Sequence, residues 1–301
     1  MYLMKKLLII SLVLVTLLTS SCSKNTMNNS KKSDYPDSEP VKRDEVLFNR
    51  FDSEKVDGVD VYLDFSGLDD GYFGVSLKDG IEKRVKLRVI KDDLTYTYDV
   101  LTKDMTAIPL QMGNGEYLIK VFEQVEGTTY VLLYGQTLDL DLEDEKIVYL
   151  YPNQIVNYNE NSKVVDESFN TVKDDKNDLD RIYHLFTYVL DTITYDHEKA
   201  ELIKDIYILP DLDEAVTTGK GICFDYASLL CALCRIQHIP SRVIVGYTDI
   251  DYHAWCEIYL ENEGWINPRL YFNSSSWSLV DPTFADSGKE YEGKYDEVYK
   301  Y

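Results

Sequence analysis

The sequence is short of histidine, cysteine and basic residues, and each shortage restricts what the protein can do. Only four histidines and five cysteines occur in 301 residues, too few for a dense disulfide scaffold. Lysine and arginine total 31 against 53 acidic residues, which gives a formal net charge of −22. A surface this acidic repels nucleic acid and anionic lipid headgroups, so we expect neither as a partner.

Metal-binding patterns are also missing. Cys231 and Cys234 form a single C-x-x-C, but no second such pair or histidine pair completes a zinc site. Both lie in an apolar run, so we interpret them as small buried helix residues rather than as redox or zinc ligands. No run matches an EF-hand loop, and we expect no metal and no other cofactor.

Residues 1–22 are typical of an export signal, because two lysines precede an uncharged apolar run at 7–18 that is short for a membrane span. The ending LTSSC at 18–22 resembles the lipobox of bacterial lipoproteins, although Thr19 stands where that family usually has leucine. The resemblance implies that Cys22 carries a lipid that holds the mature protein outside the cell membrane. If the lipobox is not used, the protein is secreted.

The composition then divides the chain into three parts. Residues 23–45 are almost all polar, which predicts a flexible linker. The remainder is long enough for two domains. We place a β-rich domain at 46–148 and a mixed domain at 149–301.

The first domain repeats short β-rich runs over 59–142, with turn residues between them such as GNG at 113–115. Evenly spaced strands without helical signals predict an antiparallel, immunoglobulin-like β-sandwich. We interpret its many tyrosines as strand formers rather than as a sugar-binding surface. No catalytic group of residues is evident in this domain.

In the second domain the spacing of apolar residues changes from strand-like alternation to helical periodicity. Helices followed by strands predict an α+β fold. Helical spacing is expected at 178–190, 213–216 and 223–235, and strands at 242–247, 254–260 and 277–281.

Cys223 follows two glycines, Gly219 and Gly221, at the expected start of a helix. A cysteine in the first helical turn lies at the positive end of the helix dipole, beside unpaired N–H groups that favour the thiolate. The glycines let the backbone bend sharply and leave room for a substrate. Cys223 is therefore the candidate nucleophile, and its backbone N–H is the natural first oxyanion donor.

A nucleophilic thiolate needs a group that takes and returns a proton, and histidine is the usual one. His253 begins the run HAWCEIYL at 253–260, where alternation puts Trp255 on the same face and Cys256 on the opposite, packed face. Cys256 is thus expected in the core. The other histidines are interpreted as exposed or capping residues: His184, His197 and His238.

A carboxylate should orient the imidazole, and Asp281 in WSLVDPT, ahead of a strand-ending proline, is the candidate. Taken alone, an aspartate at this position is more simply a turn residue.

Taken together, these segments resemble, in order, three motifs of the transglutaminase-like superfamily: GKGICFDYA at 219–227, HAWCE at 253–257 and WSLVDPT at 277–283. IPSRVIVGY at 239–247 resembles the segment between the nucleophile helix and the sheet in that family. The resemblance covers roughly residues 150–285. An additional WINP segment at 265–268 lies between the histidine and aspartate strands, so the rim of the site is expected to differ.

The resemblance implies a papain-like fold and a triad of Cys223, His253 and Asp281. Tyr195 lies in a region where the family often has a tyrosine. The further candidates for substrate or oxyanion contacts are Gly221, Tyr195 and Trp255.

The implied function is that of a surface cysteine enzyme acting on amide bonds of proteins or peptides, cell-wall peptides among them. A thioester acyl-enzyme resolved by water makes it a peptidase or deamidase, and one resolved by an amine makes it a crosslinking transglutaminase. The alternative is a catalytically silent surface lipoprotein that binds a protein or glycan through its β-sandwich. The complete Cys, His and Asp set favours the enzyme, while nothing indicates an oligomeric state.

Overall fold

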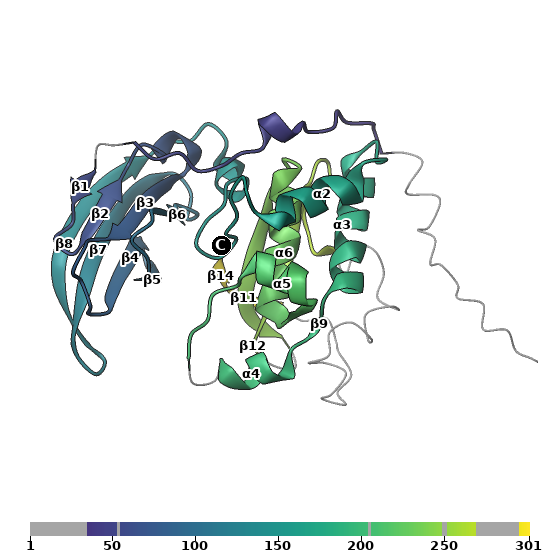
Figure 1. Cartoon of the computed structure of the whole chain (residues 1–301). Coiled ribbons are helices and arrows are strands. Elements are labelled where there is room, and N and C mark those ends of the chain that lie inside the picture. The colour runs from purple at the N-terminus through teal and green to yellow at the C-terminus, as the bar shows by residue number, and fades with distance from the viewer. Residues whose placement is uncertain (1–34, 53–54, 204–205, 249–251, 269–294) are drawn as a thin grey trace, which may run out of the picture. The chain divides into compact units, whose positions relative to one another are not determined.

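The computed structural model describes residues 35–52, 55–203, 206–248, 252–268 and 295–301 (Figure 1). They belong to one unit, Tyr35–Tyr301, which contains two separate hydrophobic cores. The expected export signal, Cys22 and Asp281 lie outside the described residues. None of the described helices is long and apolar enough to cross a lipid bilayer.

The first region consists of two antiparallel four-stranded sheets. The first sheet has the order β1-β2-β3-β6, formed by Val56–Asp57, Val61–Asp64, Tyr72–Leu77 and Thr106–Pro109. The second has the order β5-β4-β7-β8, formed by Leu94–Val100, Val85–Lys91, Gly115–Glu126 and Thr129–Leu140. The predicted antiparallel strands are therefore present.

Alternating apolar residues explain why these sheets pack together. Val85, Leu87 and Val89 of β4 are fully buried, whereas the residues between them are more exposed. They share one core with residues of the other sheet, such as Leu63 and Phe73. Burial of one face of each sheet stabilises the region through the hydrophobic effect.

The second region contains five helices and two sheets among the described residues. The helices are α2 (Lys163–Val172), α3 (Asp178–Thr192), α4 (His197–Leu202), α5 (Leu212–Thr218) and α6 (Cys223–Ile236). A parallel pair joins β9 (Thr194–Tyr195) to β10 (Lys220–Gly221). An antiparallel sheet has the order β13-β12-β11-β14, formed by Gly264–Ile266, Tyr252–Leu260, Ser241–Thr248 and Tyr295–Lys300. Short 3-10 turns occur at Arg43–Glu45, Leu68–Asp70 and Glu145–Tyr149.

Capping residues set the helix boundaries. The Asn177 side chain accepts a hydrogen bond from Asp180 N at the start of α3, and Asp211 does the same for Glu214 N in α5. Gly219, with φ 65°, ends α5 in the left-handed conformation. The three predicted helices and the two predicted strands that fall in the described residues are confirmed. The strand expected at 277–281 lies outside those residues, and β14 was not anticipated.

Helix α6 is the centre of the second region. It packs against β11 and β12 on one side and against α2, α3 and α5 on the other (Figure 1). Because it is surrounded, 11 of its 14 residues are buried, as expected for a helix that is apolar on nearly all sides.

The prediction of a flexible linker at 23–45 is wrong for its second half. Ser38 donates a hydrogen bond to Asp178 and accepts one from Arg181 at 2.7 Å, and Tyr35 donates one to the Glu261 carbonyl. Val46, just beyond this segment, is buried in the core of the second region. The polar composition suggested flexibility, but hydrogen bonds hold this segment in place. The most important are those that Arg181, which is only 2% exposed, donates to Ser38.

Candidate active site

Cys223 is the first residue of α6, and its free thiol is partly buried. Strand β10, which pairs with β9, ends two residues before Cys223. Gly221 pairs with Tyr195 in register, and Asp196 N donates to the Gly221 carbonyl at 2.9 Å. The structure therefore brings together three of the predicted site residues, Cys223, Gly221 and Tyr195, at the start of one helix.

The role expected for Gly221 needs correction. A side chain at this position would place its Cβ 2.8 Å from the Asp225 Cβ and 3.3 Å from Ile193 Cγ2. The space beside Gly221 is thus filled by neighbouring side chains and is not room for a substrate. Glycine is required here so that the chain can pass close to α6.

Asp225 and Lys199 stabilise this turn, and the sequence reasoning missed both. Asp225 is 1% exposed; its carboxylate accepts hydrogen bonds from Ile222 N at 2.9 Å and from Lys199 Nζ at 2.8 Å. The first bond satisfies an N–H at the helix start, and the second neutralises a buried charge. An aspartate at the third helical position was a detectable capping signal. Nothing in the sequence singled out Lys199 of α4.

His253 is the second residue of β12 and is 8% exposed. It pairs with Gly246 of β11, and Trp255, also buried, pairs with Ile244. The prediction that Cys256 faces the core is confirmed, since it packs in the same cluster as the residues of α6. Because β12 packs against α6, the candidate histidine and the candidate nucleophile lie on adjacent elements.

The remaining histidines contact other groups. His184 Nδ1 lies 2.8 Å from Asp175 Oδ1, and His238 Nε2 lies 2.8 Å from the Glu45 carbonyl oxygen. His197 begins α4, and its ring centroid is 5.1 Å from that of Tyr195. It is therefore closer to the Cys223 turn than expected and serves as a control for His253.

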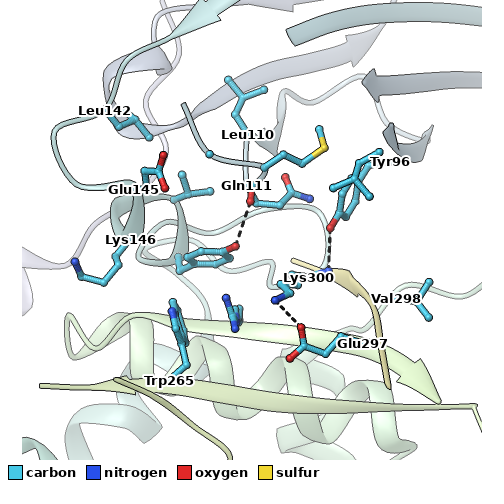
Figure 2. A pocket seen from close by; sticks show the side chains of 16 residues that line it. Tyr96, Leu110, Gln111, Leu142, Glu145, Lys146, Trp265, Glu297, Val298 and Lys300 are labelled. Carbon is cyan, nitrogen blue, oxygen red and sulfur yellow. Dashed lines mark hydrogen bonds and ion pairs between the residues drawn. The ribbon is translucent and has the colours of Figure 1, made fainter. Parts of the chain in front are cut away.

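Figure 2 shows a cavity of about 510 Å³. Its lining combines aromatic and charged side chains, and none of Cys223, Gly221, Tyr195, His253 or Trp255 is among them.

Most charges in this cavity are already neutralised. The Arg242 guanidinium lies 4.0 Å from the Trp265 ring centroid and 2.7 Å from a Glu257 oxygen, and Lys300 pairs with Glu297. The Tyr96 hydroxyl accepts a hydrogen bond from Lys300 N at 3.1 Å, and burial raises the pKa of Tyr96 to about 12. Within the described ranges, no group of three or more His, Cys, Asp or Glu residues could hold a metal ion.

Comparison with known proteins agrees with the motifs. Residues 166–268 match the model of the transglutaminase-like superfamily, so the chain contains a transglutaminase-like domain. This stretch includes Cys223 and His253 and ends before Asp281. No curated protein matches the chain.

Two solved structures are similar to parts of the chain. A candidate cysteine protease from Cytophaga hutchinsonii is 18% identical, with 73% of this chain and 79% of that chain covered and a TM-score of 0.39. The structure of a TGase is 19% identical, with 37% of this chain and 31% of that chain covered and a TM-score of 0.30.

Proposed function

We propose that the protein is a cysteine enzyme of the cell surface that acts on amide bonds of proteins or peptides. One observation carries the proposal. Cys223 starts the buried helix of a transglutaminase-like segment, and that helix packs against the strand that bears His253. A helix start is where a nucleophilic thiolate is best stabilised.

The proposed reaction divides amide cleavage into two steps. His253 takes the Cys223 proton, the thiolate attacks the carbonyl carbon, and the backbone N–H of Cys223 stabilises the oxyanion. His253 then protonates the departing amine or ammonia, and a thioester remains. Asp281 orients the imidazole in this scheme. Water or an amine resolves the thioester, which gives hydrolysis or crosslinking, and cell-wall peptides are one class of substrate within reach of a surface enzyme.

The test is the pH dependence of Cys223 alkylation by iodoacetamide in the full-length protein, followed by mass spectrometry. We expect the profile of the parent to change in His253→Ala, because the imidazole takes the Cys223 proton in the proposed reaction. His197→Ala is the matched control, because that ring lies near the same turn without a proposed role, and its profile should match the parent. Identical profiles in the parent and in both variants would contradict the proposed pairing of Cys223 with His253.

The location is part of the proposal. The LTSSC ending at 18–22 supports lipid attachment at Cys22 and an extracytoplasmic position. Incorporation of labelled fatty acid into the parent but not into Cys22→Ser would support the anchor, whereas equal labelling of both would contradict it.

We also propose an immunoglobulin-like topology for the first region. With β1 set aside, the orders β2-β3-β6 and β5-β4-β7-β8 correspond to the A-B-E and C′-C-F-G arrangements of such sandwiches.

A second candidate function is binding without catalysis, and the cavity in Figure 2 favours it, since aromatic and charged lining is suited to a polar ligand. Loss of amide turnover in Cys223→Ala with partner binding intact is the result expected of the enzyme. No turnover by the parent, together with binding that is lost in Trp265→Ala, would favour the binding protein.

A further inference from the structure

Two of the buried cysteines face each other across the centre of the second region. The sulfur atoms of Cys231 in α6 and Cys256 in β12 are 2.9 Å apart. Both residues are buried, at 0% and 5% exposure, and they are separated by 25 positions in the chain. All four described cysteines have free thiols in the structure.

This separation is shorter than an ordinary non-bonded contact between sulfur atoms. A disulfide requires about 2.05 Å, so the two atoms need to approach by less than about 1 Å. Neighbouring bonds already hold both elements in place. Ser241 Oγ donates to the Cys231 carbonyl at 2.9 Å, and Cys256 pairs with Val243, two residues after Ser241 on the same strand. The two sulfur atoms that would be joined are therefore already in contact, on elements that are held next to each other.

We propose that Cys231 and Cys256 form a disulfide when the chain folds in an oxidising compartment. The bond would tie the helix that starts with Cys223 to the strand that bears His253, and it would leave Cys223 and Cys234 as thiols. The inference relies on the proposed export but not on the proposed reaction. It also changes the interpretation of these residues, which the sequence suggested were merely small buried side chains.

The chemistry is thiol–disulfide exchange with a small-molecule or protein disulfide as the oxidant. One cysteine thiolate attacks the oxidant and releases one thiol. The second cysteine thiolate then attacks the protein sulfur of the mixed disulfide and releases the second thiol. Two cysteine thiols are oxidised and one external disulfide is reduced to two thiols.

Burial indicates when this exchange happens. Desolvation raises the pKa of the Cys256 thiol well above its ordinary value, so little thiolate exists in the closed fold. An external disulfide also has no access to a 5% exposed residue. The bond therefore forms while α6 and β12 are coming together, and it is slow to form once folding is complete.

The test uses the full-length double variant Cys22→Ser, Cys223→Ala, which leaves Cys231, Cys234 and Cys256. The protein is reduced, unfolded and refolded in a mixture of reduced and oxidised glutathione. Remaining thiols are then alkylated in denaturant, and the digested protein is analysed by mass spectrometry without reduction. We expect one linked peptide pair joining Cys231 to Cys256, lighter by two hydrogen atoms than its reduced components, with Cys234 alkylated. Alkylation of all three cysteines, or a link that includes Cys234, would overturn the proposal.

Thermal unfolding provides the second measurement and a matched control. Protein refolded in reductant should melt on the order of 10 °C below protein refolded with oxidised glutathione. The same shift is expected when Cys234 is also replaced by alanine, and none when Cys256 is. An equal response of both variants would contradict the proposed pairing, and the peptide map decides the question if Cys256→Ala does not fold.

The outcome is independent of catalysis. A linked peptide pair in the double variant, together with Cys223 alkylation that is the same in the parent and in His253→Ala, would support the disulfide and contradict the enzyme. The reverse result would support the enzyme and contradict the disulfide.

Discussion

The two regions of the molecule differ in which charged side chains they bury. In the β-rich region the buried charges are carboxylates, such as Asp64 at 1% and Asp99 at 6% exposure, whereas Arg84, the partner of Asp99, stays 47% exposed. In the second region, Arg181, Arg235 and Asp225 are almost fully buried. Each has hydrogen-bonding partners, among them the Ser241 and Tyr151 carbonyls for Arg235.

This difference indicates that the second region contains the functional site. Burying a charge costs free energy unless its partners are fixed in position. Such costs are tolerated where a particular local geometry matters, and in this chain one of the buried charges, Asp225, lies two residues from Cys223. The predictions below test whether the second region depends on individual contacts more strongly than the first.

The largest effect is expected at Cys223, the proposed nucleophile. Cys223→Ala should lower turnover of an amide substrate by roughly 10⁴-fold or more, because the attacking atom is removed. Its melting temperature should stay close to that of the parent, since Cys223 is only partly buried. Rate and stability are measured on the same preparation, and residual turnover near the parent rate would contradict the assignment.

Removing a buried charge partner should have the next largest effect. Asp225→Ala leaves Lys199 without its partner and the Ile222 N–H unsatisfied, which we expect to cost about 2–4 kcal/mol of unfolding free energy. Its counterpart in the β-rich region, Lys103→Ala, should leave the unfolding free energy almost unchanged, because both members of the Lys103–Asp79 pair are exposed, at 65% and 93%, and solvent screens them. Urea unfolding measures the free energy of unfolding of both variants. Equal losses would contradict the expected difference between the two regions.

Two glycines in strands offer a comparison of backbone packing. A Cβ at Gly246 would lie 2.1 Å from the Asp296 carbonyl oxygen, so Gly246→Ala should push β14 away from β11 and cost about 2 kcal/mol. At Gly135 of β8 the nearest atom would be 3.9 Å away, and Gly135→Ala should stay within about 0.5 kcal/mol of the parent. Comparable unfolding midpoints for the two variants would show that β14 adapts freely.

The smallest effect is expected from alkaline titration. The pKa of Tyr96 is raised by burial to about 12 in the folded protein, above its ordinary value near ~10 in an unfolded chain. The resulting stabilisation is complete below about pH 10 and is lost as pH rises toward about 12. Near pH 11, this titration should lower the unfolding free energy of the parent by about 1 kcal/mol. Tyr96→Phe should not show that decrease. Parallel stability curves for the two proteins over this interval would contradict the assignment.

The sequence predicts the elements of the second region well, because their signals are local. Helical spacing identifies α3, the glycines before Cys223 mark the start of α6, and alternation over 253–260 identifies β12 and the inward position of Cys256. The turn before Cys223 was predicted by its glycines, although the reason for Gly221 was not.

Contacts between distant segments could not be predicted in this way. The ion pair of Lys199 and Asp225 joins α4 to α6, and the sulfur contact of Cys231 and Cys256 joins α6 to β12. Both depend on how elements pack in three dimensions, and a single sequence contains no periodic signal for such a pairing. The ordered segment at 35–45 was missed for the same reason, since its partners lie in α3 and at Glu261.

The ordered position of Tyr35 also limits how far the protein can operate from a membrane. Under the proposed attachment at Cys22, thirteen positions separate the lipid from Tyr35, and a chain of that length spans at most about 45 Å. Had the linker been free up to residue 45, the limit would have been roughly 80 Å. A molecule anchored in this way would therefore act only in a thin layer next to the bilayer, and substrates farther away in the envelope would have to diffuse to it.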